Sequence, residues 1–238
     1  DYYRINLTDA VGSLGIQAVV DGCYLDNDQN ECSLILLDNT GHVQIVKNLF
    51  QNIAGARVRG IDYEVQFNTT PDFAKNQNES LNFRLLAGRL LEQSTTTAAG
   101  AYTDDSGTYS EPDLTLLATV NYQIGNFGIN WQQRYLPESM IGSNASYAQF
   151  APGLVVDPRV ITLDDATIQS KSYSNLGFSY QKQLSGGHTW RTSLTIENLF
   201  DADPPIVASF GQRGSSQSVP NNYEEFGRQY SLAFDYRF

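Results

Sequence analysis

With 238 residues and a formal net charge of −11, the chain is poorly suited to nucleic acid, because phosphate binding needs clustered Lys and Arg. Its 14 Tyr, 12 Phe and 19 Gly, beside one Met and two His, favour strands and turns over helices. No stretch approaches the roughly 18 apolar residues of a membrane-spanning helix. The composition therefore predicts an all-β protein without a nucleic-acid partner.

Eight segments alternate apolar and polar residues with the two-residue period of a β-strand. In chain order the apolar rows are Tyr3, Ile5 and Leu7; Ile61, Tyr63, Val65 and Phe67; Leu81, Phe83, Leu85 and Ala87; Leu114, Leu116, Ala118, Val120 and Tyr122; Phe127, Ile129, Trp131 and Tyr135; Leu176, Phe178 and Tyr180; Trp190, Leu194 and Ile196; and Tyr230, Leu232, Phe234, Tyr236 and Phe238. The opposite rows carry Arg, Glu, Asp and Asn, too many charges for the packed core of a soluble sheet.

The connections between these segments are long and short in strict alternation. The long ones cover about 10–42, 94–111, 137–170 and 200–226, whereas the short ones are TTPDFAKNQNES, 124–126 and 184–188. In an antiparallel sheet every long connection then leaves the same rim, which is typical of an outer-membrane barrel with long extracellular loops and short periplasmic turns. Aromatic residues near the strand ends fit the girdles of such a barrel. A soluble sandwich or lectin-like domain is the alternative.

Two cysteines, Cys23 and Cys32, lie nine positions apart in the acidic stretch GCYLDNDQNEC of the first long connection. A disulfide that closes a short loop is the favoured interpretation, and it predicts an oxidising compartment; two free thiols are the alternative. The segment DNDQNE at 26–31 has part of the spacing of a calcium loop but lacks its Gly. The alternatives are that the acids of the long loops keep the protein soluble at a crowded cell surface or that they attract a cationic solute.

Enzymatic motifs are absent from the sequence, including G-x-S-x-G, a P-loop and H-E-x-x-H, and His42 and His188 lie in or beside turns. We therefore expect neither catalysis nor a cofactor or resident metal. Aromatic side chains of the long loops are the candidate ligand contacts, since sugar rings and chelate scaffolds stack on such faces. These residues are Tyr102, Tyr109, Tyr147, Phe150, Phe210 and Tyr223. The alternative is that they pack the loops against one another.

Arg134 and Arg191 fall on the polar, lumen-facing side of their strands. They could meet a carboxylate of the ligand. Pairing with Glu197 or Asp235 on nearby strands is the simpler expectation.

Several short motifs resemble one family. NLFD at 198–201 is similar to the motif that ends the penultimate strand of TonB-dependent outer-membrane receptors, and GRQYSLAFDYRF at 227–238 resembles their last strand. ARVRGIDYEVQF at 56–67 is similar to a strand that precedes a periplasmic turn. DYYRI followed by a two-cysteine loop resembles the subgroup of Caulobacter- and Xanthomonas-type receptors. The order and spacing of these motifs cover essentially the whole chain.

The resemblance implies that residues 1–238 form the last eight strands of a 22-stranded transmembrane barrel, without the plug domain that fills its lumen. It implies location in the bacterial outer membrane and uptake of a scarce, bulky solute, energised by the TonB complex through the plug. An oligosaccharide is the first candidate for the solute, because the two-cysteine subgroup includes many carbohydrate importers, and a ferric siderophore is the second. Phe234, Tyr236 and Phe238 resemble the signal that the barrel-assembly machinery reads; the alternative is that they only face lipid.

The opening DYYRINL has the pattern of the second half of a strand, which predicts a fragment of a longer protein. Residues 1–9 are too short for the roughly 9–11 membrane residues of a complete strand plus its rim. The alternatives are a closed eight-stranded structural or adhesion barrel, whose first and last strands would pair, and a soluble binding domain. In an open sheet the unpaired edges would cause the isolated chain to aggregate or to fail to insert into a membrane.

Overall fold

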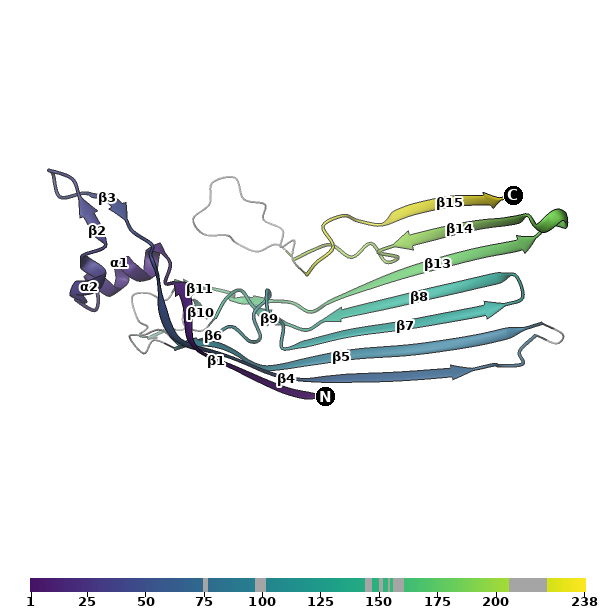
Figure 1. Ribbon diagram of the computed structural model, residues 1–238, viewed down its shortest axis with the longest axis horizontal. Coiled ribbons are helices and arrows are strands. Elements are labelled where there is room, and N and C mark those ends of the chain that lie inside the picture. Colours follow the sequence, from purple (N-terminus) through teal and green to yellow (C-terminus); the bar gives the residue numbers. More distant parts are fainter. Residues whose placement is uncertain are drawn as a thin grey trace.

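A computed structural model of the protein describes residues 1–74, 77–96, 102–143, 147–149, 152–153, 155, 161–205 and 222–238. All eight expected segments are strands of one antiparallel sheet (Figure 1). They are β1 (Tyr2–Ser13), β4 (Phe50–Thr69), β5 (Glu79–Thr96), β7 (Leu114–Ile124), β8 (Phe127–Leu136), β13 (Lys171–Gln183), β14 (Thr189–Glu197) and β15 (Gln229–Arg237). Within the described residues, no helix has the length and hydropathy needed to cross a bilayer.

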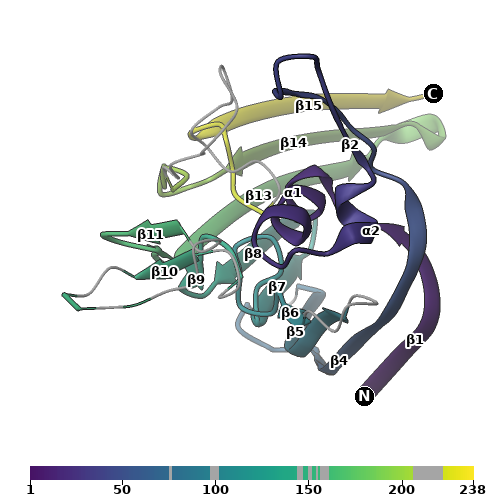
Figure 2. The ribbon, with the colours of Figure 1, turned by 90° about the vertical axis from the view of Figure 1, so that its left-hand side faces the viewer.

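The strands follow one another across the sheet in the order β1-β4-β5-β7-β8-β13-β14-β15, and β6 (Tyr102–Asp104) is added beside β5. The sheet bends through an arc but is not closed into a barrel: β1 and β15 lie at its two edges (Figure 2). The ladder between first and last strands that a closed eight-stranded barrel needs is therefore not formed. The first strand is also longer than expected, since it extends to Ser13, opposite Phe50.

The long connections gather at one end of the sheet and the short turns at the other (Figure 1). The turns use residues that tolerate the left-handed backbone: Gly125 has φ 52°, and Gly186 and Gly187 lie in the short 3-10 helix η1 (Ser185–Gly187). The long connections contain small elements that the sequence did not predict. These are α1 (Ile16–Tyr24), α2 (Gln29–Cys32), β2 (Ile35–Leu37), β3 (Val43–Val46), β9 (Ser139–Met140), β10 (Tyr147–Gln149), β11 (Ile161–Leu163) and β12 (Thr167–Ile168).

The strand register places the apolar rows of seven strands on one face. One row across the sheet consists of Phe67, Phe83, Val120, Trp131, Leu176, Ile196 and Tyr230, each opposite the next. Because directly opposite residues point to the same side, this face is continuous and apolar. Towards the short turns it carries neighbouring aromatic rings, with centroids 4.8 Å apart for Phe127 and Tyr180, 5.8 Å for Tyr180 and Trp190, and 5.7 Å for Trp190 and Phe234.

β1 departs from this expectation. Tyr2 lies opposite Ile61 and Arg4 opposite Arg59, so Arg4 shares the side of Ile61. Tyr3, Ile5 and Leu7 accordingly point to the other face, contrary to the expected placement of their apolar row. Alternation alone separates two rows of a strand, but only the register to the neighbouring strand decides which face each row joins.

Among the described residues, the buried apolar side chains lie at the end of the sheet that carries the long loops. The buried apolar side chains of the described residues are Val19, Leu136, Ala166, Ile168, Tyr173 and Tyr223. Four of them, Leu136, Ile168, Tyr173 and Tyr223, form one cluster, which we call the rim core, and Tyr109, Ile141 and Ala202 pack against it. Together with Tyr109, Ile141 and Ala202, the rim core joins the ends of β8 and β13 to segments of three long connections.

The NLFD segment forms a corner at this rim. Asn198 is 2 % exposed and has a left-handed backbone, with φ 50°. Its side-chain Oδ1 accepts from the Ala202 N–H at 2.8 Å, and its Nδ2 donates to the Ala202 carbonyl at 3.0 Å. Asp201 accepts from the Arg228 N–H at 2.7 Å, which ties the corner to the start of β15. These contacts give NLFD a structural role at the rim.

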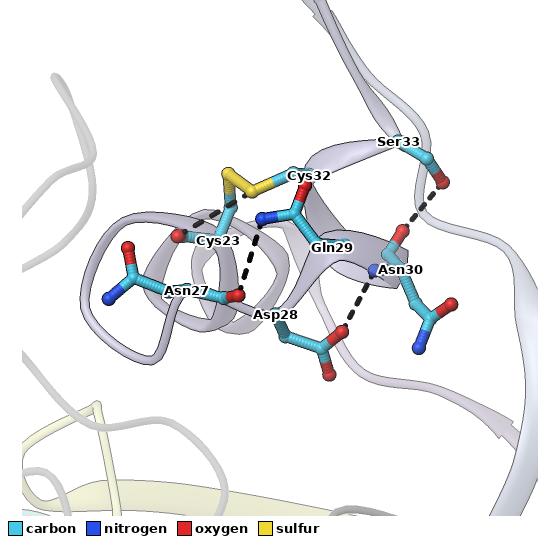
Figure 3. The surroundings of a disulfide bond; sticks show 7 residues. All are labelled: Cys23, Asn27, Asp28, Gln29, Asn30, Cys32 and Ser33. Carbon is cyan, nitrogen blue, oxygen red and sulfur yellow. Dashed lines mark hydrogen bonds between the residues drawn. A yellow bond between two sulfur atoms is a disulfide. The ribbon is translucent and has the colours of Figure 1, made fainter.

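The first long connection carries the disulfide that the sequence predicts, between Cys23 and Cys32, with 4.6 Å between their Cα atoms (Figure 3). It joins the end of α1 to the end of α2. Asp28 is the N-cap of α2, where its carboxylate accepts from the Asn30 N–H at 2.8 Å. The acidic stretch DNDQNE thus has a structural role for one of its acids.

Candidate ligand-binding face

The polar face of the sheet is its concave face. A hollow of about 380 Å³ extends over β5, β7, β8, β13 and β14, and a hollow that spans five neighbouring strands requires the sheet to bend around it. Its lining on this face consists of the polar residues Ser80, Asn82, Asn121, Gln123, Asn130, Ser179, Arg191, Ser193 and Thr195, together with Gly128 and Gly177. The apolar row that runs beside these positions therefore lies on the convex face.

One row of this concave face carries no ionisable group on any of seven strands. It consists of Asn68, Asn82, Asn121, Asn130, Gly177, Thr195 and Ser231, each directly opposite the next, and we call it the neutral row. Its asparagines bond to one another: Asn82 donates to Asn68, Asn121 to Asn82 at 3.5 Å, and Asn130 to Asn121 at 2.6 Å. An amide offers two donors and one acceptor oxygen, so hydrogen-bonding capacity is left for a ligand or water.

A larger cavity of about 700 Å³ lies toward the long-loop end. Side chains of the concave rows line it, among them Asp62, Glu64, Thr115, Leu117 and Arg134, together with Asn222 from the last long connection. This size is within the range of small-molecule sites in proteins. Asp62, Gly88 and Thr115 lie opposite one another on β4, β5 and β7. A Cβ at Gly88 would lie 3.1 Å from Thr115 Oγ1, so Gly88 leaves that hydroxyl accessible.

Arg134 is fixed at the boundary between the cavity and the rim core. Its Nη2 lies 2.7 Å from Oε1 of Glu224, and its guanidinium lies 5.2 Å from the centroid of the Tyr173 ring. The expected partners Glu197 and Asp235 are thus replaced by an acid of the last long connection. Arg191 lies directly opposite Asp235, but within the described residues the two side chains form no ion pair. An arginine with both a carboxylate and a ring beneath it has lost much of its mobility, which suits it to positioning a ligand hydroxyl.

The structure does not bring the six predicted loop aromatics together. Tyr109 and Tyr223 belong to the rim core region, where the Asn222 amide also donates to the Tyr109 carbonyl at 2.9 Å. Tyr102 lies on the convex side, where its hydroxyl is 3.4 Å from Oε1 of Glu92. Tyr147 is in β10, its side chain lies outside the described residues, and so do Phe150 and Phe210 entirely. The two placed on the rim thus pack loops together, while a ligand role for the set stays a prediction.

Two of the loop carboxylates, those of Asp38 and Asp165, accept hydrogen bonds within turns. Hydrogen bonds from Thr40 and from the His42 backbone hold the pKa of Asp38 below its usual value. The Thr167 N–H and hydroxyl do the same to the pKa of Asp165. Across the described ranges, no three His, Cys, Asp or Glu side chains are grouped so that they could hold a metal ion.

The neutral row and Asn222 are the candidate residues that the sequence did not single out. A signal existed, because the four asparagines recur in the polar rows of consecutive strands, near the ends joined by the short turns. Recognising the row required the register of every strand pair. No family model, curated protein or solved structure matches the chain. Its function is therefore inferred from the residues and their arrangement.

Proposed function

We propose that the chain is a wall segment of a TonB-dependent outer-membrane receptor that imports a bulky hydrophilic solute. The observation that carries the proposal is the pair of neighbouring rows that cross seven strands: one apolar on the convex face, the other uncharged and polar except for Gly177 on the concave face. Such a division suits a wall between lipid and a watery lumen. The family resemblance of NLFD and of the last strand, the segregated loops and the disulfide support it independently.

An oligosaccharide is the favoured solute. The neutral row and the Thr115 hydroxyl offer hydrogen bonds without charge, which matches the many hydroxyl groups and zero charge of a sugar chain. Ferric siderophores are the alternative. Many iron chelates are anionic, and the basic side chains nearest the cavity, Arg84 and Arg134, are already paired with Glu64 at 2.8 Å and Glu224 at 2.7 Å.

Other classes of protein fit less well. A closed eight-stranded barrel would need β1 and β15 to pair, and they are at opposite edges. A soluble binding domain would leave side chains such as Phe67, Leu232 and Phe234, each more than half exposed, in water. Phe234, Tyr236 and Phe238 stand on the edge strand β15 and its end, and their role as an assembly signal stays a prediction.

The test combines location, binding and energy dependence. The full-length protein is produced from its gene, outer membranes are separated from the soluble fraction, and uptake of labelled neutral oligosaccharides and ferric chelates is measured with and without a protonophore. We expect the outer-membrane fraction, oligosaccharide uptake that a protonophore stops, and binding that persists without energy. Recovery in the soluble fraction without detergent would refute the membrane proposal. Uptake of ferric chelates without uptake of oligosaccharides would identify a siderophore as the solute.

A matched pair of variants locates the binding face. Thr115→Val removes one hydroxyl from the cavity and should weaken oligosaccharide binding about fivefold, the value of one hydrogen bond. Thr119→Val is the control: it lies on the same strand and the same face, opposite Gln132, and lines neither hollow. Equal affinities of the two variants would exclude the cavity as the binding site.

A further inference from the structure

On the convex face, arginines gather at the point where the apolar band ends. Arg4 on β1 lies directly opposite Arg59 on β4, and Arg57 lies opposite Asn6 two residues further along. Side chains that are directly opposite are about 5 Å apart at Cβ, and like charges so placed destabilise a strand pair. In a chain with 26 acids and 15 Lys and Arg, such a concentration of positive charge is unusual.

Glu92 holds two of these arginines in place from below. Its Oε2 lies 2.6 Å from Nε of Arg59 and its Oε1 lies 3.5 Å from Nη1 of Arg57. Only 6 % of the Glu92 side chain is exposed, whereas the Arg57 and Arg59 side chains are 48 % and 38 % exposed. The buried carboxylate therefore fixes the stems of two guanidinium groups whose outer edges stay accessible.

A β-bulge places Glu92 on this face. Gly60 lies opposite Leu90 and Arg59 opposite Glu92, so β5 has one extra residue, Leu91, at this point. Without the bulge Glu92 would point to the concave face, because successive residues of a strand alternate between faces. Glu92 pairs with two of the three arginines, Arg57 and Arg59, and in the described part of the chain no carboxylate pairs with Arg4.

The height of the cluster indicates its surroundings. On the convex face of β5, the apolar residues extend from Leu81 to Ala87. Arg89 follows, between these residues and the arginine cluster, and is paired with Asp113 at 3.0 Å. Leu81 and Arg89 are eight residues apart, or ~27 Å along the strand and roughly 20 Å across a membrane at a tilt near 40°. That is close to the ~25 Å apolar band of outer-membrane barrels, so the cluster is level with the headgroups of the outer leaflet.

We propose that Arg4, Arg57 and Arg59 form a phosphate-binding patch for an anionic lipid of the outer leaflet, with Glu92 as its positioning residue. Guanidinium groups bind phosphate oxygens in a planar, two-point geometry, and a bound phosphate would remove the repulsion between Arg4 and Arg59. The ligand chemistry is a phosphate ester, and the position on the lipid-facing side selects a headgroup over a soluble anion. The inference rests on the proposed membrane location.

The test uses the full-length protein purified from outer membranes in non-ionic detergent, with native mass spectrometry to count bound diphosphoryl lipid A during a titration. Arg4→Gln, Arg57→Gln and Arg59→Gln are combined in one variant, which should bind lipid A at least about tenfold more weakly, because several charge-assisted hydrogen bonds are lost. Arg84→Gln is the control, since Arg84 is similarly exposed, at 49 %, but lies on the concave face beside Glu64. It should bind as the wild type does.

Arg4→Glu separates binding from folding. A glutamate opposite Arg59 makes a cross-strand ion pair, so this variant should assemble at least as well as the wild type and still lose lipid A binding. Unchanged binding by both patch variants would overturn the proposal, as would competition by millimolar inorganic phosphate equal to that of lipid A, which would identify a soluble anion as ligand. Fractionation of the same preparations distinguishes the two proposals. If the protein is found in outer membranes and the patch variants bind lipid A as the wild type does, only the phosphate-binding patch is rejected. If the protein is found in the soluble fraction, both proposals are rejected.

Discussion

The strand array and the long connections are stabilised in opposite ways. In the array, hydrogen-bonded ladders run from β1 to β15, but neither face is covered by another layer: Leu232 and Phe234 in the convex rows are 75 % and 66 % exposed. The long connections supply the buried apolar residues, including the rim core around Tyr223. An isolated sheet without a covering layer is not stable in water. The strand array therefore needs surroundings other than water on its apolar face, whereas the rim is stabilised by packing among its own side chains.

A charge on the convex face should give the largest effect that separates the two regions. Leu194 lies in mid-strand, opposite Phe178 and Leu232, and the next residue, Thr195, belongs to the neutral row. Leu194→Arg should cost up to about 4 kcal/mol of assembly free energy and deplete the protein from outer membranes, since arginine near the bilayer midplane is that unfavourable. Thr195→Arg should be tolerated. Equal yields from fractionated membranes would mean that the convex face does not meet lipid.

Removing a ring from the rim core should have the next largest effect. Tyr223 is 4 % exposed, and Tyr223→Ala should lower the free energy of unfolding of the rim by about 3 kcal/mol, as for other buried aromatic side chains. Limited proteolysis of the long connections reports this change. Leu232→Ala on the convex face is the comparison and should leave proteolysis unaltered. Faster cleavage in Leu232→Ala than in Tyr223→Ala would mean that the rim does not depend on its own packing.

The NLFD corner connects the two regions, so its loss should have an intermediate effect. Asn198→Ala removes the acceptor of the Ala202 N–H and puts a Cβ without a compensating bond at φ 50°; together these should cost about 2 kcal/mol. Asn198→Gly keeps the backbone conformation and should recover part of the loss. Thermal denaturation in detergent measures both. If alanine and glycine were equally harmful, the hydrogen bonds alone would account for the role of Asn198.

The smallest expected effect is on pH dependence within the long connections. Bonds from the Thr167 N–H and hydroxyl lower the pKa of Asp165 in the folded state, so the ionised form is favoured by folding. Its contribution is present above the pKa of an unfolded aspartate, about 3.9, and is lost as pH falls through the lower folded value. Protease resistance around β12 should therefore fall below about pH 4. Asp165→Asn should show a flatter profile across the acidic range.

Alternation predicted the eight strands because one face of the sheet carries apolar rows and the other carries polar rows along most of each strand. Where that contrast fades, the prediction stopped short: β4 and β5 continue beyond the expected segments to Phe50 and Thr96, past the bulge at Leu91. The position of a bulge cannot be predicted from the local sequence pattern, because it is set by pairing with the neighbouring strand. The same limit explains the misplaced face of β1. The nine-residue α1 was missed because its single fully buried contact, Val19, gives no period to read.

The candidate site was less predictable than the fold. Aromatic residues in loops predicted ligand contacts, yet Tyr109 and Tyr223 pack in and against the rim core, where their rings stabilise the loops. Which apolar side chain a loop buries depends on contacts between segments distant in the chain, such as Asn222 with Tyr109. Cys23 and Cys32 were predictable because a short spacing restricts both partners to the same loop.

In the proposed receptor, the neutral row has a consequence for the passage of ions. Amides, hydroxyls and glycine neither gain nor lose protons in the physiological range, so this band has the same electrostatic character in acid and in alkali. In the proposed receptor, the neutral row from Asn68 to Ser231 would itself impose no preference for cations over anions and would not respond to acidity. Charge selection by the proposed lumen must come from the ionisable groups on either side of this row, such as Arg134 toward the cavity and Arg191 toward the short turns.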